Sequence, residues 1–175
     1  MSKKYAIIAL TGIAAVLAAA PSSKAAVTAA SNYKQGKVYK ITPKSKPFKN
    51  KYVKAPTYNK KTRTYFTIRS YMEKFQKAKK GTLVLKKGTY KITNTIQVPS
   101  NVTIILEKGA KIVKSNQTGT KKMKAATTIF QLIKPSNREK SNVYGGHNGE
   151  KNIHFVGKGS NVMDLNTGST GNRRY

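Results

Sequence analysis

The sequence predicts an all-β solenoid of short stacked strands, closed on its N-terminal side by an amphipathic helix. The main evidence is a repeat: Thr82–Gly88 (TLVLKKG) recurs as Thr103–Gly109 (TIILEKG), about 21 residues later. Each copy is a short apolar run followed by a charged pair and a glycine, as in a strand that ends at a tight corner. Because one such unit cannot bury its apolar face alone, neighbouring units are expected to stack.

Two further segments extend the repeat. Ile153–Gly159 (IHFVGKG) is a third copy, and Thr128–Pro135 is a weaker copy that falls between it and the second. Four units at a spacing of about 21–26 residues predict about four coils. The alternation within the first two units assigns an inward-facing set: Leu83, Leu85, Ile92, Ile96, Val98, Val102, Ile104, Leu106, Ala110 and Ile112. Asn94 has the same parity, and its amide is expected to be hydrogen-bonded inside the stack.

The register of the third copy is open. If Gly159 matches Gly109, His154 takes the inward position of Ile104. A slip of one residue instead turns Ile153 and Phe155 inward, because side chains alternate between the two faces of a strand. Residues 114–126 and 135–151 have no periodicity, so we expect both to be loops outside the stack; the second carries Asn137, Asn142, Gly145, Gly146 and Gly149.

Residues 67–79 predict the capping helix. Ile68, Tyr71, Met72 and Phe75 have the i, i+3, i+4, i+7 spacing of one apolar face. Ser70 with Glu73 fits a capping box, Thr67 is an equally good N-cap, and Gly81 is the expected end signal. We expect this helix to cover the apolar end of the first coil.

Residues 1–25 have the order of a secretory signal peptide. Lys3 and Lys4 precede an apolar run over 5–20, and small residues at 23 and 25 suit cleavage before Ala26, with a second site after Ala30. The run is shorter than the ~20 residues of a spanning helix. We therefore expect a secreted, extracellular protein with no stable membrane span after cleavage. Attachment to a cell wall is left open.

Residues 26–63 are expected to form a basic, disordered linker. This segment contains no acidic residue, and the chain has a formal net charge of +30. Pro43, Pro47 and Pro56 oppose helix formation. The alternative is adhesion to a polyanion, with acidic polysaccharide or a wall polymer favoured; the expected export makes nucleic acid a weaker candidate. The third predicted region, residues 64–175, holds the cap and the first coils.

A resemblance to a known superfamily rests on three segments. The amphipathic helix, then Gly81–Tyr90 and Val98–Ala110, resemble the N-terminal part of pectin-lyase-like right-handed parallel β-helix proteins, which include polygalacturonases (glycoside hydrolase family 28) and pectate lyases. Lys151–Asp164 is similar to a polygalacturonase coil. The resemblance covers roughly residues 64–165. It implies a right-handed parallel β-helix, whereas unrelated activities share such first coils.

Candidate catalytic groups are few. The carboxylates are Glu73, Glu107, Glu139, Glu150 and Asp164, and they form no visible pair of the kind that glycoside hydrolysis requires. Arg63, Arg69 and Arg138 are expected at the surface without acidic partners. His147 and His154 are the only histidines and there is no cysteine, so no metal site, cofactor site or catalytic residue is assigned. In the resembling family the catalytic residues lie on later coils.

Two functional hypotheses follow. In the first, the chain is the N-terminal fragment of a secreted polygalacturonase- or pectate-lyase-like enzyme that degrades polysaccharide, and is inactive alone. The polar residues 166–175, which lack a strand pattern, suggest this truncation. In the second, it is a non-catalytic, wall-associated module whose lysine-rich surfaces bind anionic polysaccharide or another polyanion. Self-association through an open solenoid end is an additional expectation.

Overall fold

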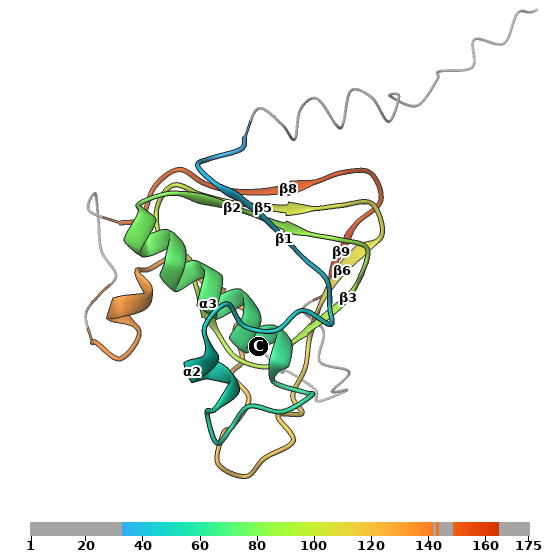
Figure 1. Cartoon of the computed structure of the whole chain (residues 1–175), viewed down its shortest axis with the longest axis vertical. Helices are drawn as coiled ribbons and strands as arrows, with labels where there is room; N and C mark the ends of the chain where they lie inside the picture. Colours follow the sequence, from blue (N-terminus) through green and yellow to red (C-terminus); the bar gives the residue numbers. More distant parts are fainter. Residues whose placement is uncertain (1–32, 142, 144–148, 165–175) are drawn as a thin grey trace, which may run out of the picture.

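Parallel strands dominate the structure (Figure 1). The computed structural model describes residues 33–141, 143 and 149–164. The predicted signal peptide, residues 1–25, and the polar residues 166–175 lie outside this part of the chain. Within it, all strand pairings are parallel, and only a few helices accompany the strands. The predicted β-rich class is therefore confirmed.

Nine strands form three sheets in the described residues. Sheet A contains β1 (Val38–Ile41), β2 (Gly81–Leu85), β5 (Val102–Leu106) and β8 (Ile153–Gly157). Sheet B contains β3 (Gly88–Ile92), β6 (Ala110–Lys114) and β9 (Val162–Asp164). Sheet C contains β4 (Ile96–Gln97) and β7 (Phe130–Gln131). The helices are α2 (Asn50–Val53), α3 (Arg63–Ala78) and the short 3-10 helix η1 (Pro135–Asn137).

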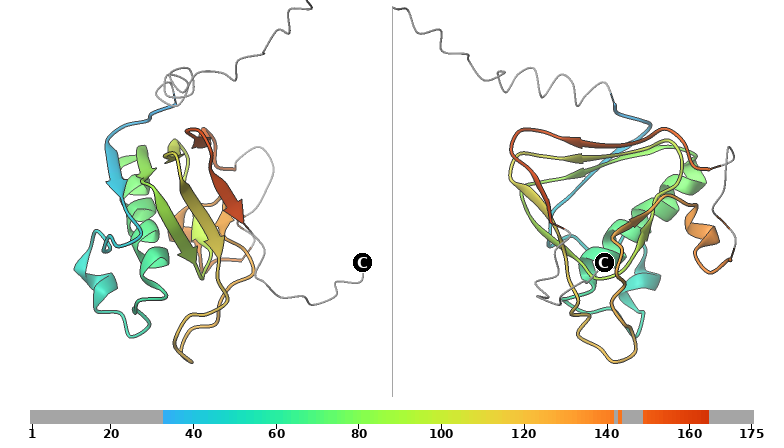
Figure 2. Two further views of the ribbon diagram at one scale, coloured as in Figure 1. Left: turned by 90° about the vertical axis from the view of Figure 1, so that its right-hand side faces the viewer. Right: turned by 180° about the vertical axis from the view of Figure 1, so that it is seen from behind.

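The chain visits the three sheets in the same order each time. Strands β2, β3 and β4 form a first layer, β5, β6 and β7 a second, and β8 and β9 a third. Each strand pairs with its counterpart in the next layer. Figure 2 shows β1 and α3 at one end of this stack and β8 and β9 at the other. The core lies between the three sheets and α3.

The predicted inward-facing set is confirmed. All ten side chains are buried, with exposed fractions of 5% or less: Leu83, Leu85, Ile92, Ile96, Val98, Val102, Ile104, Leu106, Ala110 and Ile112. Tyr90 is also fully buried. Its hydroxyl lies 2.9 Å from the Ile41 carbonyl oxygen and 2.7 Å from that of Lys86, which satisfies the polar end of the ring. Period-two alternation thus identified the core of the first two layers.

The outer face of sheet A is also covered, which the alternation did not indicate. Val84 and Ile105 are buried and pack with Val156 on this face. Residues 33–35 lie across it: the Gln35 backbone N–H donates to Thr82 Oγ1 (2.7 Å), and Thr103 Oγ1 donates to the Tyr33 carbonyl. Central parallel strands that are buried on both faces have nearly continuous apolar sequences, as β2 and β5 do.

Helix α3 starts earlier than predicted. Thr62 is its N-cap, so neither Thr67 nor the Ser70–Glu73 pair caps it; Ser70 Oγ instead donates to the Thr67 carbonyl within the helix (2.6 Å). The helix ends at Lys79, which has a left-handed φ of 61°. The predicted end signal, Gly81, is already the first residue of β2. The predicted position of the helix across the first layer is confirmed, since Met72 and Phe75 join the core.

Gly81 is required by the packing of α3 rather than by a turn. A Cβ atom at this position would lie 2.0 Å from Cδ1 of the Phe75 ring. The ring therefore occupies the space that any other residue at position 81 would need. Full burial of a phenylalanine side chain contributes roughly 1.5–3 kcal/mol. This contact lets the helix lie close against the first strand of the stack.

The prediction of a disordered linker is wrong for residues 33–63. Strand β1 pairs in parallel with β2, and the Lys86 N–H donates to the Ile41 carbonyl (2.9 Å). Ile41 and Tyr52 are core residues with exposed fractions of 2% and 4%. The lysines between them point outward and gave the segment the composition of a disordered linker. A few buried apolar side chains are nevertheless enough to order it. The ordered unit therefore begins before residue 64.

The assignment of Thr128–Pro135 as a copy of the sheet A strand is also wrong. Its strand, β7, pairs with β4 in sheet C, so it belongs to the second layer. Sheet A receives its fourth strand from β1 instead. The open register of the third copy is settled by β8: His154 pairs with Thr103 and Phe155 with Ile104. The one-residue slip was the correct alternative, and His154 faces outward.

A row of left-handed residues marks the corner that precedes three of the four sheet A strands, β2, β5 and β8. Lys79, Asn101 and Asn152 have φ values of 61°, 58° and 54°. The side chains connect the layers: Asn101 Nδ2 donates to the Lys79 carbonyl (3.1 Å), and Asn152 Nδ2 donates to Asn101 Oδ1 (2.9 Å). Asparagine tolerates this conformation better than most residues. The row keeps successive layers in register.

The predicted loops are largely confirmed. Residues 115–129 contain no helix or strand and extend from the stack. The second predicted loop, residues 135–151, begins with η1, and residues 142 and 144–148 of this loop lie outside the described part of the chain. Asn94 is only partly buried and its amide donates to the Lys124 carbonyl in the first loop (2.8 Å). It does not stack inside the core, so that expectation is wrong.

We predict that Gly81→Ala destabilises the protein by about 1–3 kcal/mol or more, because the new methyl group overlaps the Phe75 ring. Urea unfolding followed by circular dichroism measures the loss. Phe75→Leu removes part of the ring, so the double variant should lose less stability than the sum of the two single variants. Additive losses would show that the two positions do not compete for the same space.

Candidate functional site

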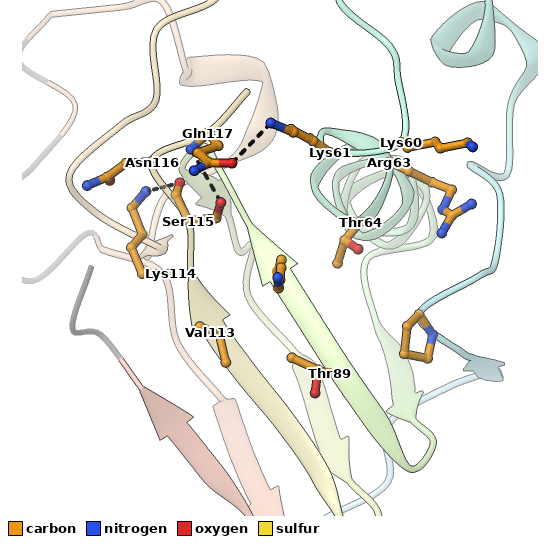
Figure 3. A pocket seen from close by; sticks show the side chains of 12 residues that line it. Lys60, Lys61, Arg63, Thr64, Thr89, Val113, Lys114, Ser115, Asn116 and Gln117 are labelled. Carbon is orange, nitrogen blue, oxygen red and sulfur yellow. Dashed lines mark hydrogen bonds between the residues drawn. The ribbon is translucent and has the colours of Figure 1, made fainter. Parts of the chain in front are cut away.

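A groove lined by cations lies where the start of α3 meets sheet B, and we call it the basic groove (Figure 3). One wall comes from the start of α3: Lys60, Lys61, Arg63 and Thr64. The floor comes from sheet B: Thr89, Lys91 and Val113. The other wall is the end of β6 and the residues after it: Lys114, Ser115, Asn116 and Gln117. Pro43 closes the rim.

The groove has the size and the charge of an anion-binding site. Its volume is about 590 Å³, which falls within the roughly 300–1,000 Å³ of small-molecule pockets. Five of its lining residues are cationic and none is acidic: Lys60, Lys61, Arg63, Lys91 and Lys114. Several like charges in one cavity raise the local potential and attract anions.

Hydrogen bonds tie the two walls together. Lys61 Nζ donates to Gln117 Oε1 across the groove (3.0 Å), as Figure 3 shows. In addition, Asn59 Nδ2 donates to the Thr118 carbonyl (2.9 Å), while Asn59 Oδ1 accepts from the Lys61 N–H (2.8 Å). The loop after β6 is thereby held against the start of α3. The groove is thus formed before any ligand arrives.

Lys114 is an unusual lining residue because its side chain is almost fully buried, with an exposed fraction of 3%. Its Nζ donates to the carbonyl oxygens of Thr93 (3.1 Å) and Ser115 (2.9 Å). Burial lowers the pKa of this ammonium group. The two carbonyls fix its position on the core side of sheet B, where Lys114 is in register with the buried Ile92, so its ammonium group does not point into the groove.

The start of α3 carries cations where a helix normally disfavours them. Lys60, Lys61 and Arg63 cluster there, and the first turn has no acidic residue. The positive end of the helix macrodipole repels cations and attracts anions. The Nε atom of Arg63 is buried and has no hydrogen-bond partner among the described residues. An anion in the groove would offset the clustered positive charge at this end of the helix.

Among the carboxylates, Glu73 lies away from the groove in an ion-pair cluster on α3. Its carboxylate accepts from Arg69 Nε (3.2 Å) and from Lys51 Nζ (3.4 Å). Burial by itself would raise the pKa of Glu73, but Tyr52, Arg69 and Lys51 together hold that pKa below its ordinary value. The prediction that Arg69 has no acidic partner is wrong, because the helical i, i+4 spacing brings the two residues together.

The other carboxylates are at four separate places. Glu139 pairs with Arg138 (2.8 Å), which corrects the prediction for that arginine too. Glu150 Oε2 accepts from the N–H and the hydroxyl of Ser100 (2.5 and 2.6 Å). Glu107 is at the corner between β5 and β6, as predicted. Asp164 is the last residue of β9 and so belongs to the third layer.

His154 does not line the groove. His154 lies on the outer face of sheet A, where its ring centroid is 4.9 Å from that of Tyr33. His147 lies outside the described residues. Within the described part of the chain, no three His, Cys, Asp or Glu side chains come close enough to hold a metal ion. None of its helices is long and apolar enough to cross a membrane.

The basic groove was missed by sequence reasoning because its walls are far apart in the chain. Residues 60–63 were placed in a disordered linker, and 114–117 in an outlying loop. One signal was available: Lys60, Lys61 and Arg63 immediately precede or begin an amphipathic helix, where anions and not cations are favoured.

Comparisons with family models, with curated proteins and with solved structures each find no match.

We predict that Glu73→Gln lowers the free energy of unfolding at neutral pH by roughly 1–2 kcal/mol, because it weakens two charge-assisted hydrogen bonds. Since the pKa of Glu73 is lowered in the folded protein, its stabilisation is present above the ordinary value of 4.5 and is lost as the pH falls through the folded pKa. The difference between variant and parent should therefore shrink in acid.

Urea unfolding at neutral pH and again at roughly pH 3, below the ordinary glutamate pKa, checks this expectation. Glu139→Gln is the matched control: its carboxylate also contacts an arginine but is 85% exposed, so little change is expected. A Glu73→Gln deficit that stays constant across the pH range would contradict the ionic origin of the effect.

Proposed function

We propose that the protein is an extracellular β-helix module that binds a polyanionic polymer in the basic groove and does not catalyse a reaction in this part of the chain. The observation that carries the proposal is the groove itself, which has five cationic lining residues and no acidic one. The net charge of +30 adds long-range attraction for the same class of ligand. Acidic polysaccharides and anionic wall polymers are the ligands that the expected export favours.

The β-helix assignment is supported by the order of the strands. The chain passes through sheets A, B and C repeatedly, with parallel pairing between layers and a helix across one end. These features agree with the resemblance of residues 64–165 to pectin-lyase-like proteins. The location outside the cell rests on the sequence of residues 1–25 and on nothing in the fold.

Binding is favoured over hydrolysis by the positions of the carboxylates. An acid and a base or nucleophile must lie across one substrate, about 5–10 Å apart. In the described structure, Glu73 and Glu139 are each engaged by arginine and Glu150 by Ser100, and none of them lines the groove. The enzymatic hypothesis, in which this chain is the N-terminal part of a polysaccharide-degrading protein, has no such support from geometry.

Titration with labelled polyanions at increasing salt tests the proposal. We expect binding to polygalacturonate or to another anionic polymer, with an affinity that falls on the order of a hundredfold between about 50 mM and about 200 mM salt. The physical reason is that each lysine–anion contact releases counterions, and added salt opposes this release. A neutral polysaccharide should not bind.

A matched pair of double variants separates the groove from general attraction. Lys60→Gln with Lys91→Gln removes two groove charges, whereas Lys77→Gln with Lys151→Gln removes two exposed charges elsewhere. The first pair should weaken binding and flatten the salt dependence more than the second. Equal effects would show that the groove is not the site, and no binding at low salt by the parent protein would overturn the function.

A further inference from the structure

The stack is closed at one end and open at the other (Figure 2). Helix α3 and β1 cover the first layer, whereas β8 and β9 form the last layer in the described part of the chain, where no strand pairs with their far side. We propose that a second copy of the protein covers this end, in a symmetric dimer in which the two third layers face each other. The inference goes beyond the proposed function, because no residue of β8 or β9 lines the basic groove.

Two core positions of the third layer are exposed. Phe155 on β8 is in register with Ile104, and Met163 on β9 is in register with Ile112. The two isoleucines are 1% and 0% exposed, whereas Phe155 and Met163 are 39% and 42% exposed. The Phe155 ring already packs on Phe130 of the second layer, with ring centroids 4.9 Å apart. A surface that covered this end would therefore complete the core in the same way as one layer covers another.

The strands of the third layer are also free of cations. They contain no lysine or arginine and one aspartate, Asp164, although the chain has 35 lysines and arginines. On β6, Lys111 is exposed, but its partner in register on β9 is Val162, which is exposed as well. Lys151 and Lys158 flank β8 at the corners. Two copies with a net charge of +30 repel each other, and this repulsion is smallest where the contacting strands carry no lysine.

The same end of a second copy offers both things that the third layer requires, which are apolar side chains and a free strand edge. A two-fold axis beside β8 places this strand antiparallel to the β8 of the second copy, and antiparallel pairs are the commonest in sheets. Centred on Phe155, the middle residue of β8, the pairing brings the two phenylalanine rings together at the axis. Exposed strand edges commonly associate with another chain in this way.

The opposite end of the stack is protected against such pairing. The other edge strand of sheet A is β1, which contains Lys40 and directly follows Lys37; both lysines are exposed. Lysines on an edge strand oppose pairing with another chain. Contact between the third layer of one copy and β1 of the next would build an open filament, and these lysines disfavour it. The proposed contact uses one face twice, so association stops at a dimer.

Sedimentation velocity of the full chain at about 1–100 µM tests the proposal. We expect a monomer–dimer equilibrium that becomes several-fold tighter between about 50 mM and about 500 mM salt, because salt screens the repulsion between the copies. Polyanion binding has the opposite dependence on salt, so the two proposals fail separately. A monomer under all conditions would overturn the dimer and leave polyanion binding intact. Filaments or larger oligomers would overturn the symmetric contact in favour of head-to-tail stacking.

Val162→Lys isolates the proposed face. The preceding layer already has Lys111 at this position of the strand, so the fold should accept the change. Because the dimer would bring one new charge from each copy into the contact, we expect it to weaken about tenfold or more. Val38→Lys is the matched control, since it makes the same substitution at an exposed position of β1. Equal weakening by both variants would point to general repulsion and contradict the assigned face.

A neutral variant guards against disturbance of the strand by the new charge. Val162→Thr keeps the branched shape and the strand preference of valine and replaces one methyl group by a hydroxyl. We expect the dimer to weaken several-fold, because apolar surface is lost on both copies. Circular dichroism confirms that each variant is folded. If folded Val162→Lys and Val162→Thr both dimerise as the parent protein does, the third layer is not the interface.

Discussion

The contact between α3 and the first layer is the constraint on which the rest of the stack depends. Every layer buries its apolar side chains against its neighbour, so the first layer needs a partner that is not another layer. Helix α3 supplies it by inserting Phe75 against the Cβ-less Gly81, and β1 pairs with the exposed edge of β2. With this end closed, the strands that follow can add one layer at a time.

Much of the core could be predicted because it depends on local alternation. Leu83, Leu85, Ile104 and Leu106 occupy equivalent positions in two copies of one pattern, and equivalent positions in stacked strands share an environment. The incorrect predictions concern residues whose environment is set by distant parts of the chain. Ile41 and Tyr52 are anchored by α3 and β2, although the lysines around them gave the segment a disordered composition. Phe130–Gln131 lies within an apolar run that resembles a sheet A strand, but it pairs in sheet C.

The basic groove could not be predicted for the same reason, since its two walls are about 50 residues apart in sequence. It is also a place where local and global preferences conflict. Lys60, Lys61 and Arg63 oppose the dipole of the helix that they begin, and Lys114 is buried although burial disfavours its charge. Such conflicts are expected at functional sites, where stability is sacrificed for binding. Most of the other lysines in the described part of the chain are exposed.

The corner formed by Lys79, Asn101 and Asn152 has a consequence for how the length of the chain can change. Between Lys79 and Asn101 the chain forms only the strands of the first layer. Between Asn101 and Asn152 it also contains the two long segments predicted as loops. Both paths return to the same hydrogen-bonded corner. Because the cost of closing a loop grows only slowly with its length, the segment between β6 and β8 is where insertions, deletions or a grafted domain can be accommodated while the layers keep their alignment.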